Sequence, residues 1–212
     1  MLVAMVAVLA SATLRDEFTG VTRVNLEKQN VVYVGVDNPV SISIAGVAPT
    51  DIAVELTGGS IRYTARPGFY IINVSGGTVA TLRVYSLKDS VRYPAGVFDF
   101  RIKKIPDPVT YVRNVSNDGV MPKEEIKDIT GISQRMVDFD FDVSFTPVSF
   151  CMSVIEEGKW KEYKTHGGAL SAEMKAALEK AQENDKIIFH DVMTKGPDRG
   201  MRHVNGVTIT VK

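Results

Sequence analysis

Phe98-Asp99-Phe100-Arg101-Ile102-Lys103-Lys104-Ile105-Pro106-Asp107-Pro108-Val109 is the stretch that decides how this 212-residue chain is organised. Its first half alternates, with Phe98, Phe100 and Ile102 on one face and charged residues on the other, which is typical of a strand with one buried face. Pro106 and Pro108 lack the backbone N–H of a strand and hold the residues before them extended. We therefore expect a strand to end here and a domain boundary near Pro106.

The bulk composition agrees with two domains of about 100 residues each. Lysine plus arginine and aspartate plus glutamate number 25 each, so the formal net charge is zero. Without an excess of basic residues, we expect no nucleic-acid partner. Cys151 is the single cysteine and cannot form an intramolecular disulfide bond. It stands in an apolar run, so we expect a small buried side chain rather than a reactive thiol.

The N-terminal segment, residues 1–20, begins with ten residues of unbroken apolar character. This run is shorter than the roughly 20 residues that a membrane-spanning helix needs. It ends in Ala10-Ser11-Ala12, which has the small-x-small form of a signal-peptidase site, although no positively charged residue precedes the run. Two interpretations stay open: an export signal, or the remnant of a longer protein.

Residues 21–105 predict an immunoglobulin-like β-sandwich. Short runs of alternating apolar and polar residues are separated by turns rich in glycine and proline, at intervals of about 8–12 residues. The Cys–Trp–Cys core of antibody domains is missing, so only the architecture is implied. The predicted strands are residues 31–36, 40–44, 51–56, 61–63, 69–74, 79–85 and 97–103.

Residues 106–212 predict a second β-sandwich, decorated by one helix. The helix follows Gly167-Gly168, with Ser171 as its N-cap and Glu173 in its first turn, where the helix dipole favours a negative charge. The residues expected on its buried face are Leu170, Met174, Ala177, Leu178 and Ala181. The predicted strands are residues 136–145, 148–155, 160–163, 186–191 and 202–211. The fold class is therefore mainly β, with two consecutive sandwich domains.

The most tempting chemical motif is a row of three carboxylates, Asp138, Asp140 and Asp142. Hard cations prefer such oxygen ligands, but a helix–loop–helix calcium site needs glycine at its sixth position and glutamate at its twelfth. Val143 and Ser149 stand there instead. We therefore expect an amphipathic strand with its phenylalanines in the core and its aspartates in water.

The three histidines, His166, His190 and His203, do not have the helical spacing of a zinc site. Such a site would have to be assembled across strands, so we expect no metal and no cofactor. No nucleophile motif or phosphate-binding loop is present. We therefore expect no catalytic residues and no small-molecule substrate. A hydrolase built around Asp138, Asp140 and His190 remains the third interpretation of the chain.

Five residues of the second domain are candidates for contact with a partner protein. Trp160 and Tyr163 lie on a predicted edge hairpin, and Lys195, Arg199 and Arg202 lie in or beside a charged loop. Aromatic and arginine side chains on a rigid frame are the usual anchors of protein interfaces. The alternative is that Trp160 covers a strand and the loop is solvated.

Several stretches of the sequence resemble the C-terminal periplasmic portion of the GldM/PorM family, from the gliding-motility and type IX secretion systems of Bacteroidota. The resemblance runs from about residue 24 to the end of the chain, and Gly-Val-Asp-Asn-Pro and Ile-Pro-Asp-Pro are its most specific motifs. The stretches that carry it are Gly35–Val47, Phe98–Val109, Phe139–Asp142, Val148–Phe150, the Gly167-Gly168 turn with its helix, and Lys195–Asp198.

The resemblance implies the last two of four periplasmic domains in an elongated, dimeric protein anchored in the inner membrane. In that family a membrane helix and a partner protein form a proton-driven motor, and the periplasmic arm transmits motion to an outer-membrane-associated ring of a lipoprotein and its companion. The sequence lacks a full membrane span, so the resemblance implies the distal, ring-contacting half. The expected function is thus a non-enzymatic periplasmic scaffold that forms a homodimer. The alternative is a secreted adhesion or carbohydrate-binding sandwich.

Overall fold

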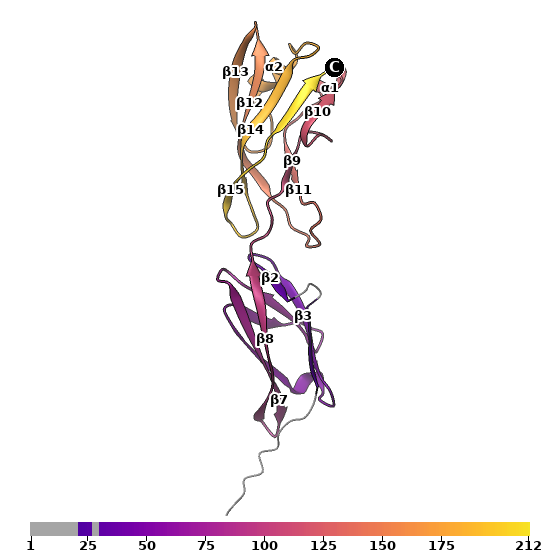
Figure 1. Ribbon diagram of the computed structural model, residues 1–212, viewed down its shortest axis with the longest axis vertical. Coiled ribbons are helices and arrows are strands. Elements are labelled where there is room, and N and C mark those ends of the chain that lie inside the picture. The colour runs from indigo at the N-terminus through magenta and orange to yellow at the C-terminus, as the bar shows by residue number, and fades with distance from the viewer. Residues whose placement is uncertain (1–20, 27–29) are drawn as a thin grey trace, which may run out of the picture. The chain divides into compact units, whose positions relative to one another are not determined.

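Figure 1 shows the computed structural model of the chain, which describes residues 21–26 and 30–212. The predicted N-terminal segment, residues 1–20, lies outside the described residues. The chain divides into two compact units: residues 102–212, together with segments 32–38 and 73–78, form the second, and the remaining described residues the first. Because segments of the N-terminal half are grouped with the second unit, this division does not test a boundary near Pro106.

In its described residues, the N-terminal half forms two sheets of four strands each. The first sheet has the order β1-β3-β6-β5 and the second has the order β2-β8-β7-β4. The elements are β1 (Thr22–Leu26), β2 (Val31–Tyr33), β3 (Asn38–Ile44), the 3-10 helix η1 (Pro49–Asp51), β4 (Ile52–Thr57), β5 (Ser60–Tyr63), β6 (Phe69–Asn73), β7 (Val79–Lys88) and β8 (Val91–Lys103).

Strand alternation builds the core of this half, as expected from the sequence. Phe100 is buried in β8, while its neighbours Asp99 and Arg101 are exposed. In β7 every second residue is buried, and Leu82 lies opposite Phe98 of β8. The predicted immunoglobulin-like sandwich is therefore confirmed. The other buried residues of the two sheets include Val40, Ile42, Ile44, Tyr70, Ile72, Ala80 and Val84.

The second unit is built on a six-stranded sheet of order β10-β16-β14-β12-β13, with β15 also paired to β14. A two-stranded sheet, β9 with β11, and two helices complete it (Figure 1). Its elements are β9 (Val109–Tyr111), β10 (Asn117–Met121), α1 (Lys123–Ile126), β11 (Ser133–Arg135), β12 (Thr146–Glu156), β13 (Lys159–His166), α2 (Ala172–Leu178), β14 (Lys186–Lys195), β15 (Met201–Val204) and β16 (Val207–Val211).

The predicted helix is present as α2. The Ser171 side chain accepts a hydrogen bond from the backbone N–H of Met174, 3.2 Å away, and so satisfies one of the unpaired donors of the first turn. All five residues expected on its apolar face are buried and pack against the sheet. The sheet contributes to this core from the inner face of β12, β14 and β16, through Phe150, Met152, Val154, Ile187, Phe189, Val192, Val207, Ile209 and Val211.

The strand predicted over residues 136–145 is wrong, because none of these residues is in a strand. Asp138 has a left-handed backbone, with φ of 53°, which a continuous strand does not allow. Phe139 and Phe141 are half-buried, with ring centroids 5.3 Å apart, and only Phe145 is buried in the core. The three aspartates are exposed, as expected.

Candidate functional site

Trp160 and Tyr163, the aromatic pair of the predicted contact surface, lie on opposite faces of β13. Trp160 is opposite Ile155 of β12 on the outer face of the sheet and is 56% exposed. Tyr163 is opposite Met152 on the inner face and packs against the core. The separation follows from strand geometry, since residues three positions apart point to opposite sides.

The inner-face tyrosine is held by a local polar network. The hydroxyl of Tyr163 donates to Glu156 across 2.8 Å, and the ammonium of Lys161 donates to the same carboxylate across 3.1 Å. These two hydrogen bonds lower the pKa of Glu156 below its usual range. Tyr163 therefore stabilises the hairpin, and Trp160 is the member of the pair that a partner can reach.

The charged loop lies at the other end of the second unit from the turn of the β12–β13 hairpin (Figure 1). Lys195 ends β14 and is exposed, and Arg199 is exposed in the loop with a left-handed φ of 62°. Arg202 is the second residue of β15, and its side chain is only 13% exposed. The structure therefore does not bring the five predicted residues together in one surface.

Arg202 is occupied by internal contacts. Its guanidinium donates to Asp198 across 2.6 Å and to Asp107 across 3.1 Å, and it lies over the ring of Phe145. It also donates to the backbone carbonyl oxygen of Ile105 across 2.7 Å. Burial alone would raise the pKa of Asp198, but the hydrogen bonds from Arg202 and from the Gly200 N–H outweigh it and lower the pKa. Arg202 thus holds the proline-rich connector and the charged loop together.

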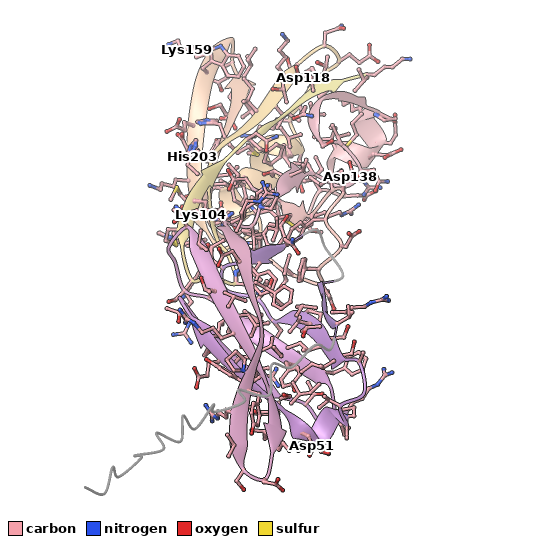
Figure 2. The ribbon with its side chains drawn as sticks, turned by 60° about the horizontal axis from the view of Figure 1, so that its bottom comes forward. Asp51, Lys104, Asp118, Asp138, Lys159 and His203 are labelled. Atoms are coloured by element: carbon pink, nitrogen blue, oxygen red, sulfur yellow. The ribbon has the colours of Figure 1, made fainter. Side chains whose placement is uncertain are left out.

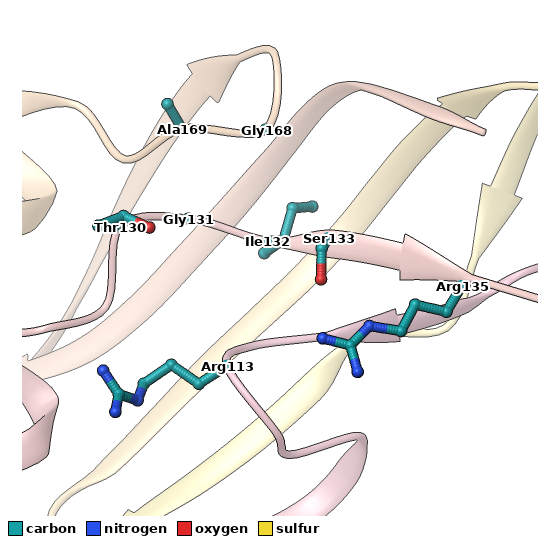
Figure 3. A pocket seen from close by; sticks show the side chains of 8 residues that line it. All are labelled: Arg113, Thr130, Gly131, Ile132, Ser133, Arg135, Gly168 and Ala169. Atoms are coloured by element: carbon teal, nitrogen blue, oxygen red, sulfur yellow. The ribbon is translucent and has the colours of Figure 1, made fainter. Parts of the chain in front are cut away.

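A pocket of about 390 Å³ opens beside the two-stranded sheet (Figure 3). Arg113 and Arg135 line this pocket, and their guanidinium groups offer positive charge. Arg113 is 3.6 Å from Glu125 and 3.8 Å from Asp128, and Arg135 lies over the ring of Tyr111. The positive charge of Arg113 is therefore already compensated by two carboxylates. The remaining lining residues are Thr130, Gly131, Ile132, Ser133, Gly168 and Ala169.

The outer face of the sheet carries a polar cluster that sequence spacing did not reveal. Cys151 of β12 lies opposite His190 of β14, and the donor atoms of Cys151, His190 and Asp191 all lie within 4.8 Å of one another. Burial, followed by the charges of Glu162 and Asp191, raises the pKa of the Cys151 thiol. The donors come from different strands, so only the pairing of β12 with β14 could have revealed them.

The outer face also holds a serine, a histidine and an aspartate that contact one another in the same sequence as the triad of serine hydrolases: Ser153, His190 and Asp191. The Ser153 hydroxyl is 2.8 Å from Nε2 of His190, whose Nδ1 is 3.2 Å from Asp191. Acyl transfer also needs backbone N–H groups that are free to stabilise an oxyanion. Ser153 lies inside β12 and is paired with Glu162 of β13 on one side and with Ile188 of β14 on the other. The surrounding backbone is therefore committed to the sheet, and the arrangement does not favour acyl transfer.

Comparison with solved structures finds low-identity likenesses. The chain resembles the fibronectin(III)-like modules of Clostridium thermocellum CbhA, with 17% identity over 90% of this chain and 94% of that one and a TM-score of 0.28. It also resembles domains 6–7 of the surface layer protein SbsC, with 10% identity over 90% and 97% of the two chains and a TM-score of 0.29. These TM-scores are below 0.5, so the fold assignment rests on the sheets described above. No curated protein matches the chain.

No helix in the described part of the chain is long and apolar enough to cross a membrane. The family comparisons cover nearly all of the described residues. The model of the GldM third domain matches residues 21–103, and the model of the GldM C-terminal domain matches residues 106–212. The resemblance inferred from the sequence motifs is thereby confirmed. The chain belongs to the GldM family and contains its third and C-terminal domains.

Proposed function

We propose that this chain is a non-enzymatic structural component of a gliding-motility and type IX secretion machine, located in the periplasm. In this proposal it works as a homodimer and contacts outer-membrane-associated ring proteins, a lipoprotein and its companion. The match of both halves to GldM domains supports the assignment to that machinery. The observation that carries the contact itself is the exposed tryptophan Trp160 on an open sheet edge.

The proposed contact surface consists of Trp160, Ile155 and the edge of β13. Ile155 and Trp160 are a cross-strand pair, 36% and 56% exposed, so their apolar side chains form one patch. Burial of a tryptophan in a partner's pocket is a frequent source of binding energy at protein interfaces. An exposed pair of this kind has no role in the core of the second unit, which supports a role in binding.

β13 is the last strand in the order of the six-stranded sheet. It pairs with β12 over eight residue pairs, and no strand within the described residues pairs with its other side. The outer backbone groups of such a strand can be extended by a strand from another protein. Lys159 and Lys164 place positive charge along this edge, whereas the ammonium of Lys161 is already paired with Glu156. The two lysines limit non-specific pairing and favour a partner segment with acidic residues.

A pocket of about 340 Å³ adjoins the same hairpin. Ile155 provides an apolar part of its wall, and Lys180 provides a positive charge. A partner side chain placed beside Trp160 could enter this pocket, so the surface offers a concave binding site as well as exposed apolar area. The other residues of the wall are Glu156, Glu157, Gly158, Gln182 and Asp185.

Binding of the purified chain to the ring lipoprotein and its companion tests this proposal. We expect Trp160→Ala to weaken binding by about thirtyfold, since an interface hot spot contributes about 2 kcal/mol or more. The matched control is Tyr63→Ala, which removes an aromatic residue that is 65% exposed in the N-terminal half. Tyr63→Ala should bind like the unmodified chain. No binding by the unmodified chain, or equal binding by Trp160→Ala, would contradict the proposal.

A further inference from the structure

β14 contains a bulge that turns two successive polar residues to the same side of the sheet. Two steps along β12, from Ser149 to Cys151, are matched by three steps along β14, from Met193 back to His190. Asp191 takes a left-handed φ of 49° at this point. Phe189 and the residue after the bulge are buried, so both His190 and Asp191 face outward. Bulges re-aim side chains in this way, often next to functional sites.

The bulge brings together donors of the types that bind transition metals. The register places the thiol of Cys151 opposite the imidazole of His190, and one donor atom from each of Cys151, His190 and Asp191 lies within 4.8 Å of the others. A tetrahedral zinc ion about 2.1 Å from its ligands separates them by about 3.4 Å. Asp191 is exposed and His190 is half-buried, so both side chains have room to rotate and reduce this difference.

His203 is placed to provide a fourth donor. It lies on β15, where it pairs with Met193, and its Nε2 atom is 3.3 Å from the Asp191 carboxylate. Figure 2 labels His203 on the surface of the second unit. Its side chain is 62% exposed, so little packing prevents the ring from turning toward the other three donors.

Both ring nitrogens of His190 have oxygen atoms nearby, so that one can bind a metal ion while the other donates a hydrogen bond. Nδ1 faces Asp191 at 3.2 Å, while Nε2 is 2.8 Å from the Ser153 hydroxyl and 3.5 Å from the Glu162 carboxylate. Histidine ligands of metals commonly donate their other N–H to such an oxygen, which fixes the orientation of the ring. The cluster therefore contains groups able to support a ligand as well as to supply the ligands themselves.

We propose that Cys151, His190, Asp191 and His203 form a binding site for a divalent transition metal ion of the zinc type. A thiol, two imidazoles and one carboxylate favour such an ion over magnesium or calcium, which prefer all-oxygen sites. Coordination forms a metal–sulfur bond, and the thiol proton of Cys151 passes to the solvent. The site joins β12, β14 and β15, and a bound ion would stabilise the outer face of the sheet.

Titration of the chelator-treated full chain with Co²⁺ tests the proposal, because thiolate ligation of cobalt produces a charge-transfer band in the near ultraviolet. We expect one equivalent of Co²⁺ to bind with this band, and excess Zn²⁺ to remove it. Cys151→Ser should abolish the band. Asp191→Asn should weaken binding at least about tenfold. Asparagine tolerates the left-handed backbone at this exposed position, so that variant keeps the fold even if Cys151→Ser does not.

The matched control is His166→Gln, which removes the remaining histidine, at the end of β13, and should bind Co²⁺ like the unmodified chain. The absence of the charge-transfer band from the unmodified chain would overturn the proposal. Unchanged Co²⁺ affinity in Asp191→Asn would also overturn it. So would equal losses of affinity in His166→Gln and His190→Gln, because binding would then be adventitious.

Discussion

The guanidinium of Arg202 donates a hydrogen bond to the backbone carbonyl oxygen of Ile105, 2.7 Å away, although 97 positions separate these residues in the sequence. The same side chain donates to Asp198 and Asp107. The carbonyl group of Ile105, which precedes Pro106, does not take part in strand pairing, because residues 104–108 carry no secondary structure. Arg202 therefore provides polar contacts to a connector that lies outside any strand.

Replacement of Arg202 by alanine is expected to destabilise the chain by about 3 kcal/mol, because it leaves the largely buried Asp198 carboxylate without its charged partner. Urea denaturation followed by circular dichroism measures this change. Arg199→Ala, an exposed position in the same loop, serves as the control and should change stability by less than about 0.5 kcal/mol. Equal effects of the two substitutions would show that the Arg202 contacts contribute little.

Protonation of Asp198 should account for part of the loss of folding stability at low pH. Its pKa is lower in the folded chain than in the unfolded chain, so its carboxylate stabilises the fold at pH values above the unfolded pKa of about 4. That contribution is lost as the pH falls from about 4 through the lower folded pKa. The slope of unfolding free energy against pH in this range should be smaller for Asp198→Asn than for the unmodified chain. If the unfolding free energies of the two proteins changed with pH in parallel, Asp198 would make no contribution to the pH dependence of stability.

Gly206 should not tolerate a side chain. It lies between β15 and β16, and a Cβ atom there would overlap the backbone carbonyl oxygen of Phe189. Gly206→Ala is expected to cost about 1–3 kcal/mol, as overpacking does. Gly76→Ala is the control, since nothing lies within 4 Å of its added Cβ atom. Thermal unfolding of the two variants compares them, and a Gly206→Ala protein as stable as the control would contradict the packing argument.

The domain boundary near Pro106 stays a prediction, which separate expression of residues 21–105 and 106–212 can test. We expect both fragments to give cooperative unfolding, because each half has its own buried core. A fragment of residues 102–212 should be more stable than one of residues 108–212, which lacks the Arg202 contacts to Ile105 and Asp107. Failure of both halves to fold would place the boundary elsewhere.

Local sequence patterns determined much of the secondary structure. The alternation through Phe98, Phe100 and Ile102 predicted a strand, now seen as the last part of β8, and the prolines that follow predicted its end. Ser171 predicted the first turn of α2. Both depend on contacts between near neighbours, so a short window of sequence contains the required information. The same reasoning failed for residues 136–145, where the alternation is present but no partner strand pairs with the segment and Asp138 adopts a left-handed backbone.

Only the tertiary structure decided which side chains meet. Their closeness in the sequence grouped Trp160 with Tyr163, but the two-residue period of β13 places them on opposite faces of the sheet. In the sequence, 38 positions lie between Cys151 and His190. The antiparallel pairing of β12 with β14 puts these two opposite one another, and the bulge adds Asp191 on the same face. Strand register is set by the burial of the whole inner face of the sheet, so no short stretch of sequence could have specified this meeting.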